Sequence, residues 1–198
     1  MKISVHELRG CLDIAAEFTR QYKEYVAPAS GSRKSRDDLL HVAQELTGKE
    51  IDIYELDEPL EHETIYGYFV AEANGYSILL RTGLHEDVIR YVLCKELFHV
   101  MLDANTEYRT TDTCGHLDQV AISFPVTDSE PGPAVRSEVL AEIGAMEFLF
   151  PYTARIEELA TTPVDFQTIT DKYKIPQYLV ERYLHPTYMA ELGAMVPK

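Results

Sequence analysis

Features that mark secreted, membrane-spanning or disulfide-rich proteins are missing from this sequence of 198 residues. It has no apolar run of about 18 residues, so no helix is expected to span a bilayer. The first residues turn polar too soon for a secretory signal. Three cysteines at wide, irregular spacing make no disulfide framework, and a cytoplasmic location is expected. These cysteines are Cys11, Cys94 and Cys114.

Basic residues are scarce. Lys and Arg number 18 against 33 Asp and Glu, and the net charge is −15. Because proteins bind nucleic acids largely by neutralising phosphates with Lys and Arg, this composition argues against DNA or RNA as a partner. The same reasoning argues against anionic membranes. A basic protein partner stays open, although a solvated acidic surface that keeps the protein soluble is the simpler interpretation.

Several catalytic and binding motifs are also absent. The chain has no nucleophile elbow, phosphate-cradling glycine loop or dinucleotide fingerprint, which excludes those enzyme classes. Residues 165–184 have the outline of a helix-turn-helix DNA reader. Their second helix, starting at Pro176, carries only Glu181 and Arg182 as charged residues and lacks a basic face. We therefore expect packing or substrate contact from this segment.

What the sequence does contain is enough for one globular domain. Hydrophobic residues make up 45% and charged residues 26%, which suits a chain that buries a real core. We divide it into an N-terminal helix with a linker, a main domain and a C-terminal tail. Their bounds are 1–30, 31–185 and 186–198.

Hydrophobic periodicity predicts helices and a small antiparallel sheet. The helices are expected at residues 3–26, 36–47, 84–102 and 134–150, with short ones from about 165 and 176. The strands are expected at residues 51–54, 66–71 and 76–80, and Asn74-Gly75 is a strong hairpin signal. The helix 84–102 is apolar nearly all round, which is typical of a buried central helix. Residues 103–133 lack periodicity and are expected to form a long loop that is either functional or mobile.

Two ionisable residues, Glu96 and His99, lie inside this apolar helix. Burying such groups is costly unless they are paired or bind a metal. The zinc-peptidase motif His-Glu-x-x-His puts two histidines four apart on one helix face, with the glutamate as general base. Here Lys95 holds the first position. Cys94 is a poor replacement, because it lies about 140° around the helix from His99. A Glu-x-x-His pattern by itself is expected about once by chance in a chain of this composition. The alternative interpretation is therefore that Glu96 and His99 are a hydrogen-bonded polar pair in the core.

A second segment gives the pattern more weight. It runs from Glu138 through Glu142 to Pro151 and, with Lys95-Glu96-Leu97-Phe98-His99, resembles the ImmA/IrrE family of metallopeptidases. In that family the first motif is followed by Glu-x-x-Ala-Asn/Asp-x-Phe-Ala-x-x-Leu-Leu-Met-Pro. Gly144 departs where the family prefers Phe. The closing segment 169–184 is also similar, so the resemblance covers about residues 36–185. The positions that match the second motif are Glu138, Ala141, Ala145, Leu149 and Pro151.

The resemblance implies an α+β, zincin-like fold for residues 31–185, with a small antiparallel sheet packed on a buried central helix and additional helices. It implies Glu96 as the catalytic base, His99 and Glu138 as zinc ligands, and Glu142 in the shell behind them. Members of the family cut helix-turn-helix repressors that are often encoded beside them in mobile elements or stress regulons. Such a regulatory protein is the expected partner.

Lys95 alters this expectation, because zinc catalysis needs three protein ligands and an ammonium has no lone pair. Our hypothesis is that Lys95 replaces the metal electrostatically by pairing with Glu96 and Glu138, which leaves a protein impaired or inactive as a zinc protease. One alternative is an active metallo-endopeptidase with an altered zinc site, for which Cys114 and His116 are candidate extra ligands. The other is a non-catalytic α+β interaction domain.

Overall fold

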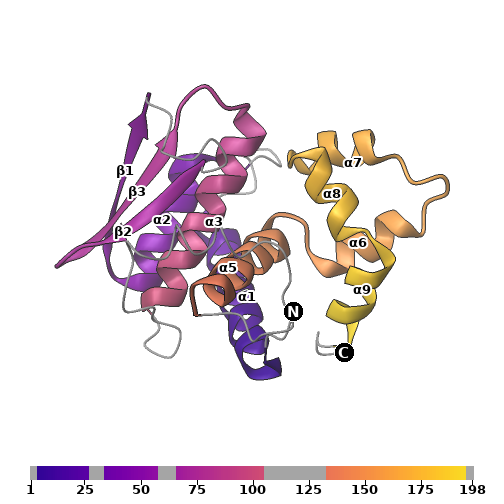
Figure 1. Ribbon diagram of the computed structural model, residues 1–198, viewed down its shortest axis with the longest axis horizontal. Coiled ribbons are helices and arrows are strands. Elements are labelled where there is room, and N and C mark those ends of the chain that lie inside the picture. The colour runs from indigo at the N-terminus through magenta and orange to yellow at the C-terminus, as the bar shows by residue number, and fades with distance from the viewer. Residues whose placement is uncertain (1–3, 27–33, 58–65, 105–132, 195–198) are drawn as a thin grey trace.

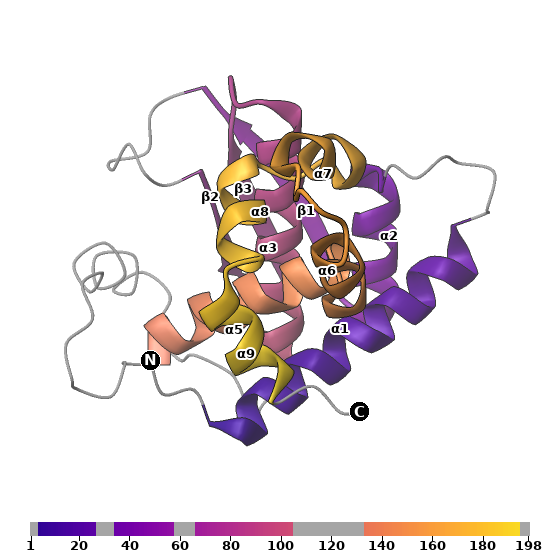
Figure 2. The same cartoon turned by 90° about the vertical axis from the view of Figure 1, so that its right-hand side faces the viewer.

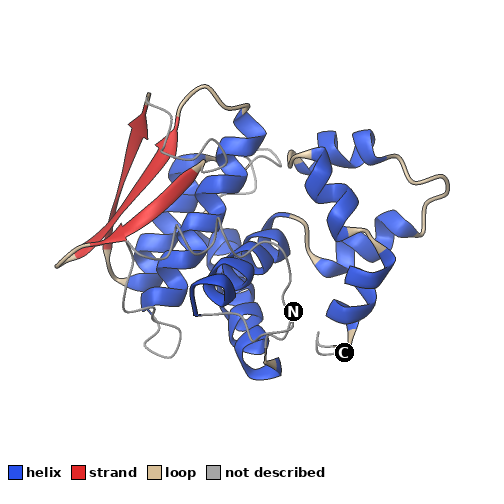
Figure 3. Ribbon diagram, in the orientation of Figure 1, coloured by secondary structure: helices blue, strands red, loops and turns tan. Residues whose placement is uncertain are grey.

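The computed structural model describes residues 4–26, 34–57, 66–104 and 133–194 (Figure 1). Helices and strands are both present, so the expected mixed α and β composition is confirmed (Figure 3). None of the helices in these ranges is long and apolar enough to cross a membrane. In chain order the elements are α1 (Val5–Tyr25), α2 (Arg36–Thr47), β1 (Glu50–Leu56), β2 (Gly67–Ala71), β3 (Gly75–Arg81), α3 (Glu86–Ala104), α5 (Pro133–Leu149), α6 (Tyr152–Leu159), α7 (Phe166–Tyr173), α8 (Gln177–Tyr183) and α9 (Pro186–Gly193).

The sheet is mixed, so the prediction of a purely antiparallel sheet was wrong. Its strand order is β1-β3-β2, with β2 antiparallel and β1 parallel to β3. The hairpin expected at Asn74-Gly75 joins β2 to β3. From β1 at one edge the chain continues to β2 at the other edge, and β3 then fills the position between them. As a result β3 runs parallel to β1, with Gly75 opposite Glu50. Gly75 has no β-carbon, and one there would collide with the Glu50 carbonyl.

Local signals explain where several helices begin and end. Ser4 and Glu7 form a reciprocal capping box at the start of α1. Ser35 caps α2, which ends at Gly48 in the left-handed conformation that glycine adopts without strain. Asp165 accepts hydrogen bonds from two backbone N–H groups at the start of α7. These short-range interactions place the predicted ends of α1, α2 and α7 close to the observed ones.

The central helix α3 is buried between the sheet and the other helices (Figures 1 and 2). The N-terminal helix α1 packs into the same core. Phe18 of α1 packs edge-on against Phe98 of α3 and Phe148 of α5, with ring centres 5.7 and 4.7 Å away. The Cys11 thiol also contacts the Leu140 carbonyl on α5. Residues 4–26 and the main domain therefore fold around one hydrophobic core.

Gly144 on α5 faces Phe98 on α3. A β-carbon at this position would overlap the ring of Phe98. Gly144 therefore leaves room on α5 for the ring of Phe98 from α3.

The C-terminal helices α6–α9 form a group on the side of α5 away from the sheet (Figures 1 and 2). Arg155 on α6 is buried and donates to the Phe150 carbonyl at 2.6 Å and to Glu147 at 3.0 Å. The predicted tail contains α9, which buries Met189 and Leu192. Through residue 194 the chain is therefore part of the folded domain.

Candidate functional site

Two polar residues of the buried helix α3 lie inside the protein, as the sequence predicts. Only 2% of Glu96 and 3% of His99 is exposed. Lys95 precedes them, and 20% of its side chain is exposed. Because α3 passes through the core, these groups depend on partners within the protein rather than on bulk water.

The partners come mainly from α5, whose first turns run beside this part of α3. Oε1 of Glu138 lies 3.0 Å from Nε2 of His99, and Oε2 lies 2.7 Å from Nζ of Lys95. Glu138 therefore joins the two residues that stand four apart on α3. Burial raises its pKa, but His99 and the Lys95 ammonium outweigh burial and bring the pKa well below its ordinary value.

The Lys95 ammonium contacts both carboxylates of the site. Nζ lies 3.4 Å from Oε1 of Glu96, in addition to its contact with Glu138. Burial by itself lowers the pKa of Lys95, but the two carboxylates raise it above its ordinary value. The pKa of Glu96 is raised by burial, which Lys95 and His99 only partly offset. A protonated lysine thus lies between the two carboxylates of the site.

His99 is fixed by three neighbours. Nδ1 lies 3.1 Å from the hydroxyl of Ser137, and the ring of Phe69 on β2 stacks on the imidazole with centres 5.4 Å apart. The third is Glu138, whose Oε1 lies within ion-pair distance of Nε2 but does not form a hydrogen bond with it. Sequence reasoning missed Ser137 and Phe69, although Ser137 directly precedes the predicted ligand.

Glu142, expected behind the ligands, faces the C-terminal helices. Its carboxylate accepts from the Tyr183 hydroxyl at 2.9 Å and lies 3.0 Å from Arg182, both on α8. The Tyr91 hydroxyl on α3 approaches the other carboxylate oxygen at 3.4 Å. These contacts tie α8 to the two helices of the site. Arg182 and Tyr183 lie in the closing segment that carried the family resemblance, which is the one signal that pointed to them.

These side chains do not fit a zinc ion. His99 and Glu138 offer two donors on adjoining helices, but Lys95 presents an ammonium where a third ligand is required. Within the four described ranges, no group of three or more His, Cys, Asp or Glu side chains is arranged to hold a metal. The candidate extra ligands Cys114 and His116 lie outside the described residues.

No protein-family profile matches the chain, and no curated protein sequence matches it either.

Proposed function

We propose that this protein is a metal-independent relative of the ImmA/IrrE metallopeptidases that binds a regulatory protein without cutting it. One observation carries the proposal. The ammonium of Lys95 lies 2.7 Å from Glu138 and 3.4 Å from Glu96, the carboxylates that the family resemblance assigns to zinc binding and base catalysis. The positive charge that these carboxylates need comes from the chain itself.

The electrostatics of the site support this reading. Two carboxylates and an imidazole on facing helices need a nearby positive charge, because isolated anions are costly to remove from water. A lysine four residues before His99 provides it, and its raised pKa keeps it charged at neutral pH. A zinc ion added beside this ammonium meets repulsion and finds one ligand too few.

The juxtaposition of His99 and Glu138 supports the family scaffold. Their side chains approach to 3.0 Å from residues 39 positions apart in sequence, as the resemblance predicts for two ligands of one site. On this proposal the scaffold persists without the metal charge and holds the kind of partner that the ImmA/IrrE family cuts. By this reasoning the partner is a helix-turn-helix repressor.

Metal content tests the first half of the proposal. We expect purified wild-type protein to hold almost no zinc after dialysis against micromolar zinc, as measured by elemental mass spectrometry. The substitution Lys95→His completes the ligand set, and we expect about one zinc per chain in that variant. The control Lys95→Met removes the ammonium without adding a donor and should stay zinc-free. Stoichiometric zinc in the wild type contradicts the proposal.

Partner binding tests the second half. A repressor encoded beside the gene for this chain is mixed with the wild type and with Glu96→Gln. We expect a stable complex, an intact repressor and equal affinity for both proteins, since a base is not used. Cleavage that stops in Glu96→Gln supports an active peptidase instead. Failure of any complex to form favours the unrelated interaction domain.

A further inference from the structure

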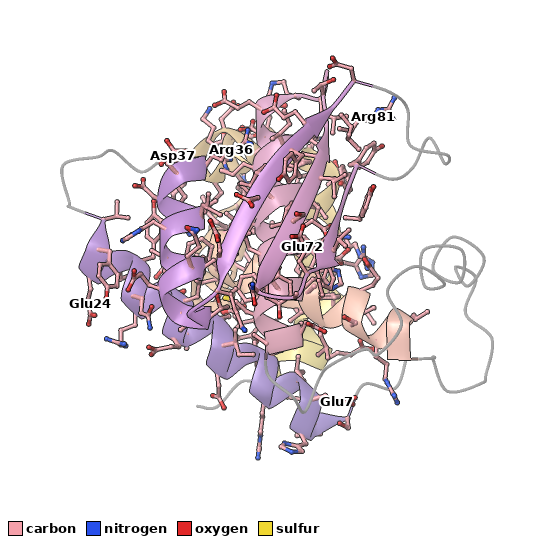
Figure 4. The ribbon with its side chains drawn as sticks, turned by 90° about the vertical axis from the view of Figure 1, so that its left-hand side faces the viewer. Glu7, Glu24, Arg36, Asp37, Glu72 and Arg81 are labelled. Atoms are coloured by element: carbon pink, nitrogen blue, oxygen red, sulfur yellow. The ribbon has the colours of Figure 1, made fainter. Side chains whose placement is uncertain are left out.

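The outer face of the sheet carries an apolar surface that the described helices leave uncovered. Residues alternate between the two faces of a strand. Those facing α3 contribute to the core: among them, Ile51, Ile78 and Leu80 are buried, while Ile53 and Phe69 pack against the core. The alternate positions on the same strands therefore point away from the helices. Figure 4 looks onto this face, with the strands in front of the helices.

Each of the three strands places apolar residues on this outward face, beside the polar Asp52, Ser77 and Arg81. Tyr54 of β1 and Tyr68 of β2 both pair with Leu79 of β3, so these three form one continuous row across the sheet. Leu56 and Val70 occupy the neighbouring rows. Tyr54 is 52% exposed. None of the five belongs to the hydrophobic clusters of the described protein. A sheet with one solvated face normally carries polar residues there, so this pattern indicates a binding surface.

The charged residues beside the Tyr54–Leu79–Tyr68 row indicate what charge a partner carries. Exposed Asp52 lies in the next row, opposite Ser77, and Glu72 accepts a hydrogen bond from that serine. Arg81 lies at the other end of β3. The whole chain carries a net charge of −15, so two copies repel each other and a cationic partner is attracted. The charges therefore argue against self-association through this face.

We infer that the outer face of β1–β3–β2 is a docking surface for a protein segment that places aromatic or aliphatic side chains on the Tyr54–Leu79–Tyr68 row and Lys or Arg beside Asp52. The inference deepens the proposed function and rests on it only for the claim that the protein acts by binding. It does not involve Lys95. The two ideas can therefore fail separately.

A peptide selection on the full chain tests the surface. The probe is a displayed library of random 12-residue peptides, followed by synthesis of the enriched sequences and measurement of their affinities. We expect enriched peptides to combine aromatic or aliphatic residues with Lys and Arg. The substitution Tyr54→Ser should weaken them about tenfold, the effect of losing one interface anchor.

Matched variants separate this surface from others. Tyr178 on α8 is 54% exposed, a fraction similar to the 52% of Tyr54. Tyr178→Ser is therefore an equivalent truncation at another surface and should leave peptide affinity unchanged. Asp52→Lys should weaken binding more than Asp13→Lys, which makes the same charge change at an exposed site on α1. Peptide binding must also persist in Lys95→His, whatever that variant shows about zinc.

Several outcomes overturn the inference. It fails if no peptide is enriched over background, or if the enriched peptides are acidic. It also fails if Tyr178→Ser costs as much affinity as Tyr54→Ser. A wild-type dimer in light scattering that Tyr54→Ser converts to a monomer assigns the face to a second copy, and so contradicts it as well.

Discussion

Two lysines of this protein are withdrawn from water in different surroundings. Lys34, which precedes α2, donates to the backbone carbonyl of Phe148 and lies 3.8 Å from the centre of that ring. Lys95, on α3, contacts the carboxylates of Glu96 and Glu138. The first ammonium is held by neutral groups and the second by anions.

The pKa values of the two lysines move in opposite directions. Burial lowers the pKa of Lys34 to about 8, with some help from the positive charge of Arg90, although the nearby Cys94 acts the other way. Burial also lowers the pKa of Lys95, but the two carboxylates reverse the shift. The difference teaches that burial alone does not keep a lysine charged. The carboxylates around Lys95 do, because they hold its proton in place.

The largest expected effect comes from removing each ammonium in turn. Lys95→Met leaves Glu96 and Glu138 close together without a cation, so we expect the free energy of unfolding to fall by about 3 kcal/mol. Lys34→Met removes a hydrogen bond together with an unpaired buried charge, and these effects should nearly cancel, to within about 1 kcal/mol. Urea denaturation at neutral pH measures both.

A surface lysine provides the control for this comparison. Lys172 pairs with Glu158 at 2.6 Å, but its side chain is 58% exposed. Lys172→Met should cost no more than about 0.5 kcal/mol, since water replaces the lost partner. Equal losses for the variants at Lys95 and Lys34 would contradict the assignment of Lys95 as a paired charge.

The sequence carries much of this fold because many of its signals are local. The capping residues Ser4 and Ser35 and the glycine at position 48 place the ends of α1 and α2 close to the predicted ones. The apolar run of α3 predicts its burial, and with it the burial of Glu96 and His99. Pairing of β1 with β3 is a contact between strands that are not neighbours in sequence, so no local pattern revealed its parallel direction.

In the candidate site too, some contacts could be predicted from the sequence and others could not. The contact of Lys95 with Glu138 followed from combining helix spacing with a family resemblance. The environment of Lys34 had no such guide, because its acceptor Phe148 lies 114 residues away along the chain. Ser137 and Phe69 were missed for the same reason: a hydroxyl or a ring becomes part of a site only through packing between elements.

A smaller effect should tell which carboxylate holds the Lys95 ammonium. Glu138 has a lowered pKa and is therefore ionised, so Glu138→Gln should lower the free energy of unfolding by about 2 kcal/mol. Glu96 has a pKa raised by burial and lies farther from the ammonium, at 3.4 Å, so Glu96→Gln should cost about 1 kcal/mol or less. Denaturant unfolding of the two variants compares these costs.

A double variant provides the control. If Lys95 and Glu138 act as a pair, Lys95→Met combined with Glu138→Gln should cost clearly less than the sum of the single losses. Additive losses, or a larger cost for Glu96→Gln than for Glu138→Gln, would assign the ammonium to Glu96.

The last expected effect is the contribution of Lys34 to the dependence of stability on pH. Its pKa is about 8 in the folded protein and about 10.5 when the chain unfolds. Between these values the unfolded chain holds a proton that the folded protein has released, so the contribution of Lys34 to stability rises with pH across this window. Allowing for the partial exposure of Lys34, we expect the wild type to gain about 1 kcal/mol relative to Lys34→Met between these pH values.

Lys95 supplies the matched control, because its raised pKa keeps it protonated in the folded protein throughout the window. Lys95→Met should therefore retain the rise that Lys34→Met loses. Unfolding free energies at pH 8 and 10.5 for the three proteins decide the matter. If Lys34→Met keeps the wild-type slope, the Lys34 ammonium is not desolvated as its contacts indicate, and the contrast between the two lysines must lie elsewhere.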